Sequence, residues 1–329
     1  MAGAGKKILA LSGGVGGAKL ALGLAQELPA GALAVLVNTA DDFRHHGLHI
    51  SPDIDTLLYT LSGRSNRAQG WGIEGETWQV REALAALGGD TWFQLGDGDL
   101  ATHLLRTGLL AEGQALSAVT ARLAQAMGIQ SAIYPMAEEP VSTLVHTDEG
   151  ELPFQHYFVR RRCEPAVSGF SFRGLDAARV PAPLQALLAS GEVAAVVICP
   201  SNPFVSIDPI LGVPGLWQQL AALAVPVVAV SPIIGGRAVK GPAAKMMAEL
   251  GLPVDAAAVV QHYRQRYPGL VSHVVLDNED AALADALGQS GNEEIAVHNT
   301  LMKTLDDKRQ LARDVLTKVL KNVLPEARR

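Results

Sequence analysis

The sequence predicts an α/β protein with a Rossmann-like, doubly wound, mostly parallel sheet that carries an inserted smaller α+β domain. Short continuous apolar runs bounded by turn residues are typical of buried parallel strands. Four such runs occur, at residues 8–11, 33–37, 194–198 and 227–230. Between the second and third runs lies a long segment with helical patterns followed by strand-like alternation, which indicates an insertion. The 329 residues are 48% hydrophobic, enough for a sizeable core.

The first strand runs into the glycine-rich segment Ser12-Gly-Gly-Val-Gly-Gly-Ala-Lys-Leu, and a helical pattern begins near Ala18. Glycines let backbone N–H groups converge on an anion, and the positive end of the following helix dipole points at the same place. We therefore expect Gly13, Gly14, Gly16 and Gly17 to bind phosphate. No Gly-Lys-Ser/Thr follows, which excludes a Walker loop. Alone, the segment fits a tight strand-to-helix turn as well as a nucleotide site.

The second strand ends in the most polar segment of the chain, which begins Asn38-Thr-Ala-Asp-Asp. This segment brings Asp41, Asp42, Asp53 and Asp55 into one loop and the first turn of a helix that follows Pro52. Hard oxygen ligands beside a phosphate site suit Mg²⁺, which takes one or two carboxylates and completes its shell with water and phosphate. Mg²⁺ is therefore the predicted cofactor. Aspartate is also favoured at helix N-caps and turns, so some of these residues are open to a purely structural interpretation.

Three histidines in the same segment, His45, His46 and His49, raise zinc as an alternative. Their spacing lacks the helical arrangement of a metalloprotease, and their neighbours are oxygen donors. Magnesium remains the preferred metal.

Residues 63–183 are predicted to form the inserted domain, between core segments 1–62 and 184–329. The insertion is expected to contain helices at 77–87 and 116–127 and strands within 142–160. Residues 116–127 also resemble half of a helix-turn-helix. The net charge of −6 argues against DNA binding, so packing against a neighbouring helix is the better interpretation.

A second polar cluster lies at the start of another predicted helix in the insertion. Asp97 and Asp99 flank a glycine there, and Asp99, Thr102, His103 and Arg106 share one helical face. This face could hold an anionic or hydroxylated substrate. The alternative is an Asp-capped helix with exposed polar residues.

Polar or glycine-rich loops also follow the third and fourth strands. Because the carboxyl ends of parallel strands meet at one edge of a sheet, these loops should face the glycine segment and hold a diphosphate. Asn202 offers both a donor and an acceptor to a base edge, although it could instead only shape the turn. The loop residues predicted to bind the nucleotide are Ser201, Asn202, Ser206, Ser231, Gly235 and Gly236, with Lys19, Lys240 or Lys245 offsetting charge.

Helical patterns complete the second core segment. They cover residues 182–188, 216–223, 242–250 and 301–323.

Composition and charge narrow the class of protein. The acidic balance excludes a general nucleic-acid or anionic-membrane binder, although the cluster at 160–162 could meet phosphate locally. Cys163 and Cys199 lie far apart without metal-ligand spacing, so both are expected to be reduced and structural. No signal-type segment or apolar stretch of membrane length occurs, so we expect a cytoplasmic protein without a membrane partner. An apolar surface is compatible with a homodimer.

Seven motifs, in order along residues 7–280, carry a family resemblance. They are Ser12-Gly-Gly-Val-Gly-Gly-Ala-Lys-Leu, Asn38-Thr-Ala-Asp-Asp, Ile50-Ser-Pro-Asp-Ile-Asp-Thr, Gly70-Trp-Gly with Glu76-Thr77, Leu95-Gly-Asp-Gly-Asp-Leu-Ala-Thr-His, Pro200-Ser-Asn-Pro with Ser206-Ile, and Val230-Ser-Pro-Ile-Ile-Gly-Gly. Together they resemble the 2-phospho-L-lactate transferase family of deazaflavin coenzyme F-420 biosynthesis. The resemblance implies that a guanosine-diphospho-linked three-carbon acid gives its phospho-acid portion to the ribityl hydroxyl of the deazaflavin Fo, releasing GMP. Whether the acid corresponds to 2-phospholactate, phosphoenolpyruvate or phosphoglycerate is left open.

The resemblance also implies roles for particular residues. Mg²⁺ would be held by Asp42, Asp53 and Asp55, with Asp55 favoured for metal and Asp53 for orienting the acceptor. The insertion would bind the deazaflavin, whose flat ring needs an apolar slot. Its predicted contacts are Trp71, Asp97, His103 and Arg106, with Trp92 and Phe93 as further ring contacts. Gly98 stands where the family commonly has an arginine, so this chain lacks that side chain.

Two other classes compete with a transferase. Nucleotide-sugar-binding regulatory proteins share the glycine loop and an Asp-Asp segment, and would bind a nucleotide without turnover. They are expected to continue with a Gly-Ser-Ser-Gly type loop, whereas this chain has Phe43-Arg-His-His-Gly. A nicotinamide oxidoreductase would need an acidic residue for the ribose at the end of the second strand, and none stands there.

Overall fold

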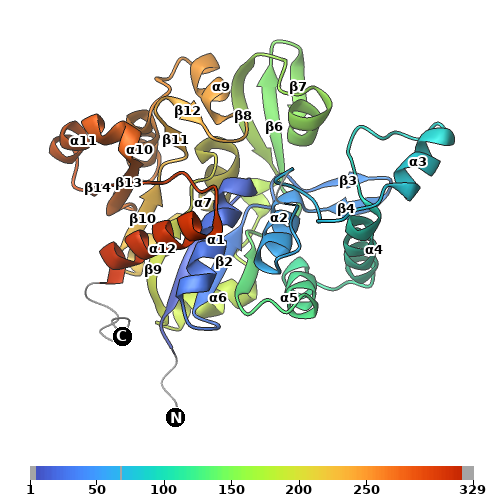
Figure 1. The fold of residues 1–329 in the computed structure, drawn as a ribbon, viewed down its shortest axis with the longest axis horizontal. Coiled ribbons are helices and arrows are strands. Elements are labelled where there is room, and N and C mark those ends of the chain that lie inside the picture. Colours follow the sequence, from blue (N-terminus) through green and yellow to red (C-terminus); the bar gives the residue numbers. More distant parts are fainter. Residues whose placement is uncertain (1–4, 67–68, 321–329) are drawn as a thin grey trace.

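A seven-stranded, all-parallel sheet forms the centre of the computed structural model, which describes residues 5–66 and 69–320 (Figure 1). The strand order is β14-β13-β10-β9-β1-β2-β5. The strands are β1 (Lys7–Ser12), β2 (Leu33–Val37), β5 (Ala132–Pro135), β9 (Val193–Ile198), β10 (Val227–Val230), β13 (His273–Asp277) and β14 (Glu294–His298). The four predicted strands and the α/β class are confirmed. Because β1 lies between β2 and β9, a topological switch point stands at the carboxyl end of β1.

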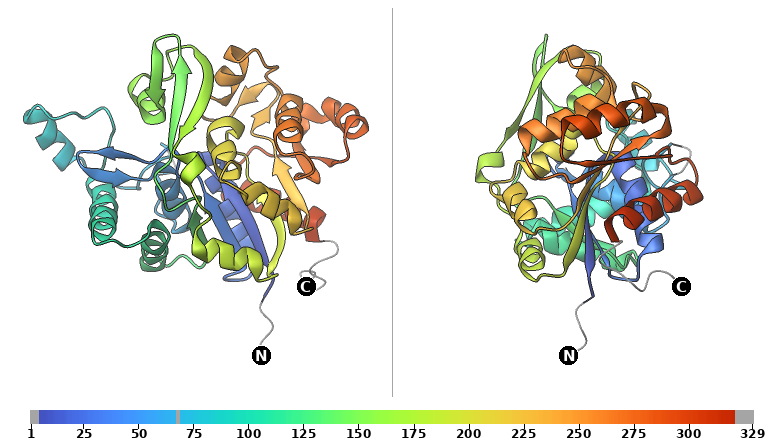
Figure 2. Two further views of the ribbon diagram at one scale, coloured as in Figure 1. Left: turned by 180° about the vertical axis from the view of Figure 1, so that it is seen from behind. Right: turned by 90° about the vertical axis from the view of Figure 1, so that its left-hand side faces the viewer.

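Helices cover both faces of this sheet (Figure 2). Successive strand residues point to opposite faces, so Leu9 and Leu11 lie in one core cluster while Ile8 and Ala10 lie in the other. The face of Ile8 is covered by α1 (Gly14–Glu27), α2 (Pro52–Leu61), α5 (Leu116–Ala126) and α12 (Leu305–Leu320). The face of Leu9 is covered by α6 (Ala182–Ala189), α8 (Leu216–Ala222), α9 (Ala243–Glu249) and α10 (Ala256–Arg266). This arrangement is the predicted doubly wound fold.

Helix α1 begins at Gly14, four residues earlier than the predicted start near Ala18. Three of the four glycines therefore lie inside the helix rather than in a loop. Glycine lowers helix propensity, which hid this first turn from the sequence pattern. The close packing described below accounts for its presence.

The predicted insertion shares the central sheet, since β5 pairs with β2 in parallel. Its other elements include a three-stranded antiparallel sheet of order β7-β6-β8, seen at the top of Figure 1. These elements are α3 (Gln79–Ala86), α4 (Asp97–Ala111), β6 (Ser142–Thr147), β7 (Gly150–Pro153) and β8 (Val167–Arg173). The predicted helices at 77–87 and 116–127 are confirmed as α3 and α5.

The prediction of strands within residues 142–160 is right for β6 and β7 and wrong at its end. Residues His156–Arg160 form a π-helix, with Tyr157 fully buried. A short apolar run does not distinguish a strand from a helical turn.

The predicted helices in the second core segment are confirmed as α6, α8 and α9. The last helix begins at Leu305 rather than at 301, and its predicted residues 321–323 lie outside the described part of the chain. The remaining elements are β3 (Phe43–His45), β4 (Leu48–Ile50), a second π-helix (Pro203–Ile207), α7 (Asp208–Leu211), β11 (Ile233–Ile234), β12 (Arg237–Ala238), α11 (Ala284–Ser290) and two 3₁₀ turns (Leu175–Ala177, Asn278–Leu283). Within residues 5–66 and 69–320, no helix combines the length and apolarity needed to span a bilayer.

Candidate functional site

A cavity of about 590 Å³ lies at the carboxyl edge of the sheet, at the switch point. The loops after β1, β2, β9, β10 and β14 all contribute to its wall, so the predicted loops do face one another. The predicted residues that line it are Gly13, Gly14, Gly16, Lys19, Asp53, Trp71, Ser201, Asn202, Ser206 and Ser231. Those outside its lining are Gly17, Asp42, Asp55, Asp97, His103, Arg106, Gly235 and Gly236. The volume suits a nucleotide-sized ligand.

Three glycines of the first turn allow the loop after β9 to approach closely. The Gly13 N–H donates to Ser201 Oγ at 3.0 Å. A Cβ added at Gly13 would lie 2.5 Å from the Ser206 Cβ. A Cβ at Gly16 would overlap the Pro200 carbonyl, and one at Gly17 would overlap the hydroxyls of Ser12 and Ser201. These positions need glycine for packing, whether or not phosphate binds there.

Gly14 differs from its neighbours. It has φ +64°, in the left-handed region, and a Cβ added there would meet nothing closer than Asp53 Oδ1 at 3.9 Å. Among the four glycines, it leaves the most open space towards the cavity at the amino end of α1. The prediction of a phosphate cradle is therefore best placed here.

Asp41 and Asp53 face the cavity and share one hydrogen-bond donor. The buried Asn38 amide donates to Asp41 Oδ2 and to Asp53 Oδ2, each at 3.0 Å. Asp41 Oδ1 is buried with no hydrogen-bond partner among the described residues. Burial and the nearby Asp53 charge raise the pKa of Asp41 well above its ordinary value, and burial raises the pKa of Asp53 to about 6. Two crowded, under-neutralised carboxylates form a site suited to a cation.

Asp42 lies beside this pair but outside the cavity lining. Its Oδ2 accepts hydrogen bonds from Ser51 Oγ at 2.7 Å and His49 Nε2 at 3.1 Å. Its Oδ1 is buried and has no partner in the part of the chain described. One oxygen is therefore committed to the protein and the other is free.

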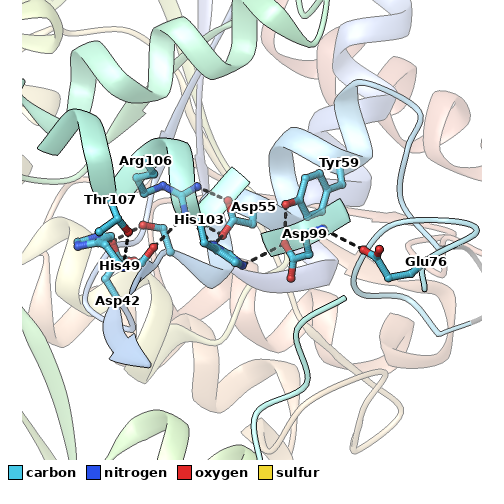
Figure 3. A network of polar contacts seen from close by, with 10 residues as sticks. Asp42, His49, Asp55, Tyr59, Glu76, Asp99, His103, Arg106 and Thr107 are labelled. Atoms are coloured by element: carbon cyan, nitrogen blue, oxygen red, sulfur yellow. Dashed lines mark hydrogen bonds and ion pairs between the residues drawn. The ribbon is translucent and has the colours of Figure 1, made fainter. Parts of the chain in front are cut away.

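Asp55 belongs to a buried polar network that joins α2 to α4 (Figure 3). Arg106, which is completely buried, donates to both of its oxygens, with Nη1 at 3.1 Å from Oδ2. His103 Nδ1 lies 3.7 Å from the same carboxylate. The Asp55 carboxylate is therefore neutralised by an ion pair and does not line the cavity.

The network continues from His103 to Asp99. His103 Nε2 lies 3.1 Å from Asp99 Oδ1, which also accepts a hydrogen bond from the Tyr59 hydroxyl. Glu76 accepts from the N–H groups of Gly98 and Asp99 at 2.6 and 3.0 Å and so caps α4 (Figure 3). The shared helical face of residues 99, 102, 103 and 106 does exist, but it packs against α2 instead of lining the cavity.

Asp97 organises the start of α3. It accepts from Thr77 Oγ1 at 2.6 Å and from the N–H groups of Gln79 and Val80 at 3.0 and 3.1 Å. These hydrogen bonds lower its pKa. Asp97 therefore has a structural role, but at the start of α3 rather than as the cap of its own helix, which Glu76 provides.

The loops after β9 and β10 use several predicted ligand-binding groups internally. Asn202 Oδ1 accepts from the N–H groups of Phe204 and Val205 at 3.0 and 3.4 Å, capping the second π-helix. Ser231 Oγ pairs with the backbone of Ile233, and the Gly235 N–H donates to Asp280. Asn202 lines the cavity, but its acceptor is already occupied.

The cavity wall also carries cations and aromatic rings. Lys19 Nζ donates to the Met302 carbonyl at 2.9 Å, and burial followed by the nearby Lys240 charge lowers its pKa. Lys245 lies outside the lining, paired with Glu249. The aromatic rings in the wall are Trp71, Trp92, Phe93, Phe154 and Phe158.

The histidines considered for zinc have other partners. His49 pairs with Asp42, and His46 Nε2 lies 2.7 Å from the Asp90 carbonyl. Across residues 5–66 and 69–320, no group of three or more His, Cys, Asp or Glu side chains is arranged to hold a metal. Mg²⁺ needs no such group, since water and phosphate supply most of its ligands.

Sequence reasoning considered Asp41 but did not select it, and it missed Asn38 and Gln155. The signal for Asp41 was its place in the Asp-Asp segment. No local pattern distinguished it from Asp42, because the distinction depends on Asn38 and on the direction of the cavity.

Comparisons with known proteins show which family the chain belongs to. The model of the family "2-phospho-L-lactate transferase CofD" matches residues 8–319. A "Phosphoenolpyruvate transferase" from Streptomyces griseus is 40% identical over 315 residues, covering 94% of this chain and 97% of that protein. A "2-phospho-L-lactate transferase" from Methanosarcina acetivorans is 39% identical over 309 residues, covering 94% and 98%.

The fold has a solved relative. A UPF0052 family protein from Bacillus halodurans superimposes with a TM-score of 0.65 over 95% of this chain and 100% of that chain, at 13% identity. At that identity the likeness concerns the fold alone. The family model and the closely similar sequences, by contrast, extend over nearly the whole chain and include every segment that builds the cavity. The chain belongs to the 2-phospho-L-lactate transferase CofD family, a family of transferases.

Proposed function

We propose that this chain transfers a phospho-three-carbon-acid group from a guanosine-diphospho-linked donor to the ribityl hydroxyl of Fo, with release of GMP, in coenzyme F-420 biosynthesis. One observation carries the proposal: two crowded carboxylates and a glycine turn share one cavity with a wall of aromatic rings. The first two features suit a metal-bound diphosphate, and the third suits a flat acceptor. The printed names of the relatives support a phospho-acid donor.

Mg²⁺ fits the carboxylates that face the cavity. Asp41 and Asp53 would hold it, and the charge of Asp42 acts on both of them from outside the cavity lining. Asp55 is the least suited of the four, because Arg106 already neutralises it. When bound, the metal ion would stabilise the negative charge that develops on the diphosphate.

The remaining steps concern the protein's own groups. The amino end of α1 at Gly14 and the ammonium group of Lys19 would bind the diphosphate. Asp53 would orient the ribityl hydroxyl, whose oxygen attacks the phosphorus that bears the three-carbon acid. The phosphorus–oxygen bond to GMP breaks, and the hydroxyl proton passes to a carboxylate. We also propose that residues 63–183 provide the acceptor side of the site.

The identity of the three-carbon acid is the most specific part of the proposed function. Relatives named for 2-phospho-L-lactate and for phosphoenolpyruvate have nearly equal identity to this chain, so identity does not choose between them. The protein should be incubated with Fo, Mg²⁺ and each guanylylated acid in turn, followed by mass analysis of the deazaflavin. A product with one acid identifies the donor. Tight guanine-nucleotide binding without product from any acid would support a regulatory protein instead.

A further inference from the structure

One side-chain amide in the cavity wall has no hydrogen-bond partner in the part of the chain that the structure describes. Gln155 is 6% exposed and lines the cavity. Its side chain makes no capping hydrogen bond to the π-helix it precedes, and no hydrogen bond to any described residue. A buried amide carries two donors and an acceptor, and such groups in folded proteins are almost always satisfied. The free amide in the cavity wall can therefore pair with a ligand that has a complementary edge.

The residues on both sides of Gln155 also belong to the cavity wall. Phe154, Gln155, Phe158, Val159 and Arg162 all line it. The rings of Phe154 and Phe158 are stacked, with centroids 5.4 Å apart and planes 13° apart. Phe158 belongs to the π-helix His156–Arg160, a rare conformation that is frequent at functional sites.

Backbone strain follows at the end of this segment. Arg162 has φ +49° and Cys163 has φ +59°, left-handed values that cost energy for residues other than glycine. Such strain is common at functional sites, and here it lies directly after the cavity-lining π-helix.

The residues that follow Gln155 contact two parts of the molecule: His156 meets an aromatic ring of the insertion, and the Tyr157 ring centroid lies 5.8 Å from Lys245 Nζ in α9. Trp92 contacts His156 at 4.9 Å between ring centroids and Phe43, just after β2, at 5.9 Å. The loops proposed to bind the nucleotide follow β9 and β10, which lie on the other side of β1 in the sheet. We assign the ligand edge next to Gln155 to the acceptor ring rather than to guanine, because Trp92 and Phe43 are suited to a flat ring and lie on the far side of β1 from those loops.

We infer that Gln155 is a specificity-determining residue that pairs with the imide edge of the acceptor's deazaflavin ring, while the surrounding rings hold its faces. The pyrimidinedione part of that ring presents an N–H between two carbonyls, and a side-chain amide can pair with such an edge through a donor and an acceptor at once. The inference rests on the proposed function.

The test is a cycle between a protein change and a ligand change. Gln155→Met keeps the length of the side chain and removes its polar atoms, and an Fo analogue methylated on the imide nitrogen removes the matching donor. Fo binding would be followed by deazaflavin fluorescence in the absence of the guanylylated acid. The KM would then be measured for Fo and for the guanylylated acid. Gln130→Met, at an exposed position outside this cavity, is the matched control.

We expect Gln155→Met to raise the Kd and KM for Fo by about fivefold to twentyfold and to leave the KM for the donor unchanged. Methylation should weaken binding to the wild type and have little further effect on the variant. Independent, multiplicative effects of the two changes would overturn the inference, as would an unchanged KM for Fo in a folded variant. Reduced affinity for GDP instead of Fo would make Gln155 a guanine reader and overturn it too.

The proposed function and the proposed role of Gln155 can be told apart by experiment. If the wild type transfers no group to Fo from any of the donors, the proposed function fails and this inference fails with it. If the wild type is active and Gln155→Met behaves like Gln130→Met, only the inference fails.

Discussion

Asp53 and Asp55 lie two residues apart on one helix, yet they have opposite surroundings. Asp53 lines the cavity, repels the neighbouring Asp41, and shares the single Asn38 amide with it. Asp55 faces away and is neutralised by the buried Arg106. Two residues correspond to about 200° around a helix, so the two carboxylates must point in nearly opposite directions. The comparison shows that a carboxylate's partners, and not its closeness to a motif, separate a ligand-binding role from a structural one.

Removal of the cavity-facing charges should have the largest effect on activity. Asp53→Asn and Asp41→Asn should each lower kcat by about 100-fold or more, since each keeps the side-chain volume and deletes a negative charge at the reacting groups. The Mg²⁺ dependence of the residual activity should weaken as well. Steady-state kinetics over a range of Mg²⁺ concentrations checks both effects.

Asp176→Asn is a suitable control, because Asp176 lies outside the cavity lining. If either cavity variant retained normal turnover and metal dependence, its carboxylate would have to be removed from the metal site. Asp42, which has one oxygen without a partner among the described residues, would then be the next candidate ligand.

The next largest effect concerns stability. Arg106→Leu leaves the Asp55 carboxylate buried without its cation and should lower the free energy of unfolding by about 3–5 kcal/mol. The double variant Arg106→Leu with Asp55→Leu should recover much of that loss, because neither charge is then buried alone. Urea unfolding of the wild type and the three variants measures both effects. A loss of less than about 1 kcal/mol in Arg106→Leu would show that the network is not structural.

Much of the fold was predictable from the sequence, because buried parallel strands are continuous apolar runs. Strands β1, β2, β9 and β10 stand out in this way. Strands β13 and β14 carry polar ends, His273 and Asp277 in β13 and Glu294 and His298 in β14, and did not stand out. Strand β5 is only four residues long.

The site was harder to predict because its partners are distant in sequence. The ion pair that neutralises Asp55 comes from Arg106, 51 residues away, and Gly13 packs against Ser206 in the loop after β9. Sequence patterns identified the polar residues but not the pairs they form. Asp41 and Gln155 became candidates only from the structure, where both line the cavity and have side-chain atoms without a partner among the described residues.

A third prediction uses the raised pKa of Asp53 in protein freed of metal by a chelator. Its pKa is about 6 in the folded state and about 4 in the unfolded state, so the folded state binds the proton more tightly. Ionisation therefore destabilises the fold: the cost is fully present above about pH 6 and disappears as the pH falls towards 4. Asp53→Asn should be more stable than the wild type at pH 7.5, by on the order of 2 kcal/mol, and equal to it near pH 4.

Thermal or urea unfolding across this pH range checks the sign. The raised pKa of Asp41 acts in the same direction. Asp55→Asn provides the contrast, since it should lower stability at pH 7.5 by weakening the pair with Arg106. If Asp53→Asn were instead less stable than the wild type at pH 7.5, the cavity-facing pair would be part of the structural framework, and the comparison that separates it from Asp55 would not hold.

The smallest expected effect separates the same two roles at Asn202. Its Oδ1 caps the second π-helix, as a structural group does, although the residue lines the cavity as a ligand-binding group does. Asn202→Ala should lower stability by about 1 kcal/mol through loss of the cap and leave the ratio of GDP to ADP affinity unchanged. Asn202→Asp keeps the capping oxygen and should retain most of the stability, so it is the matched control. Calorimetric titration of GDP, ADP and pyrophosphate on folded variants decides the matter. A GDP affinity that falls while ADP affinity holds would show that Asn202 reads guanine through its Nδ2 group, because that group is the part of the amide not used by the cap.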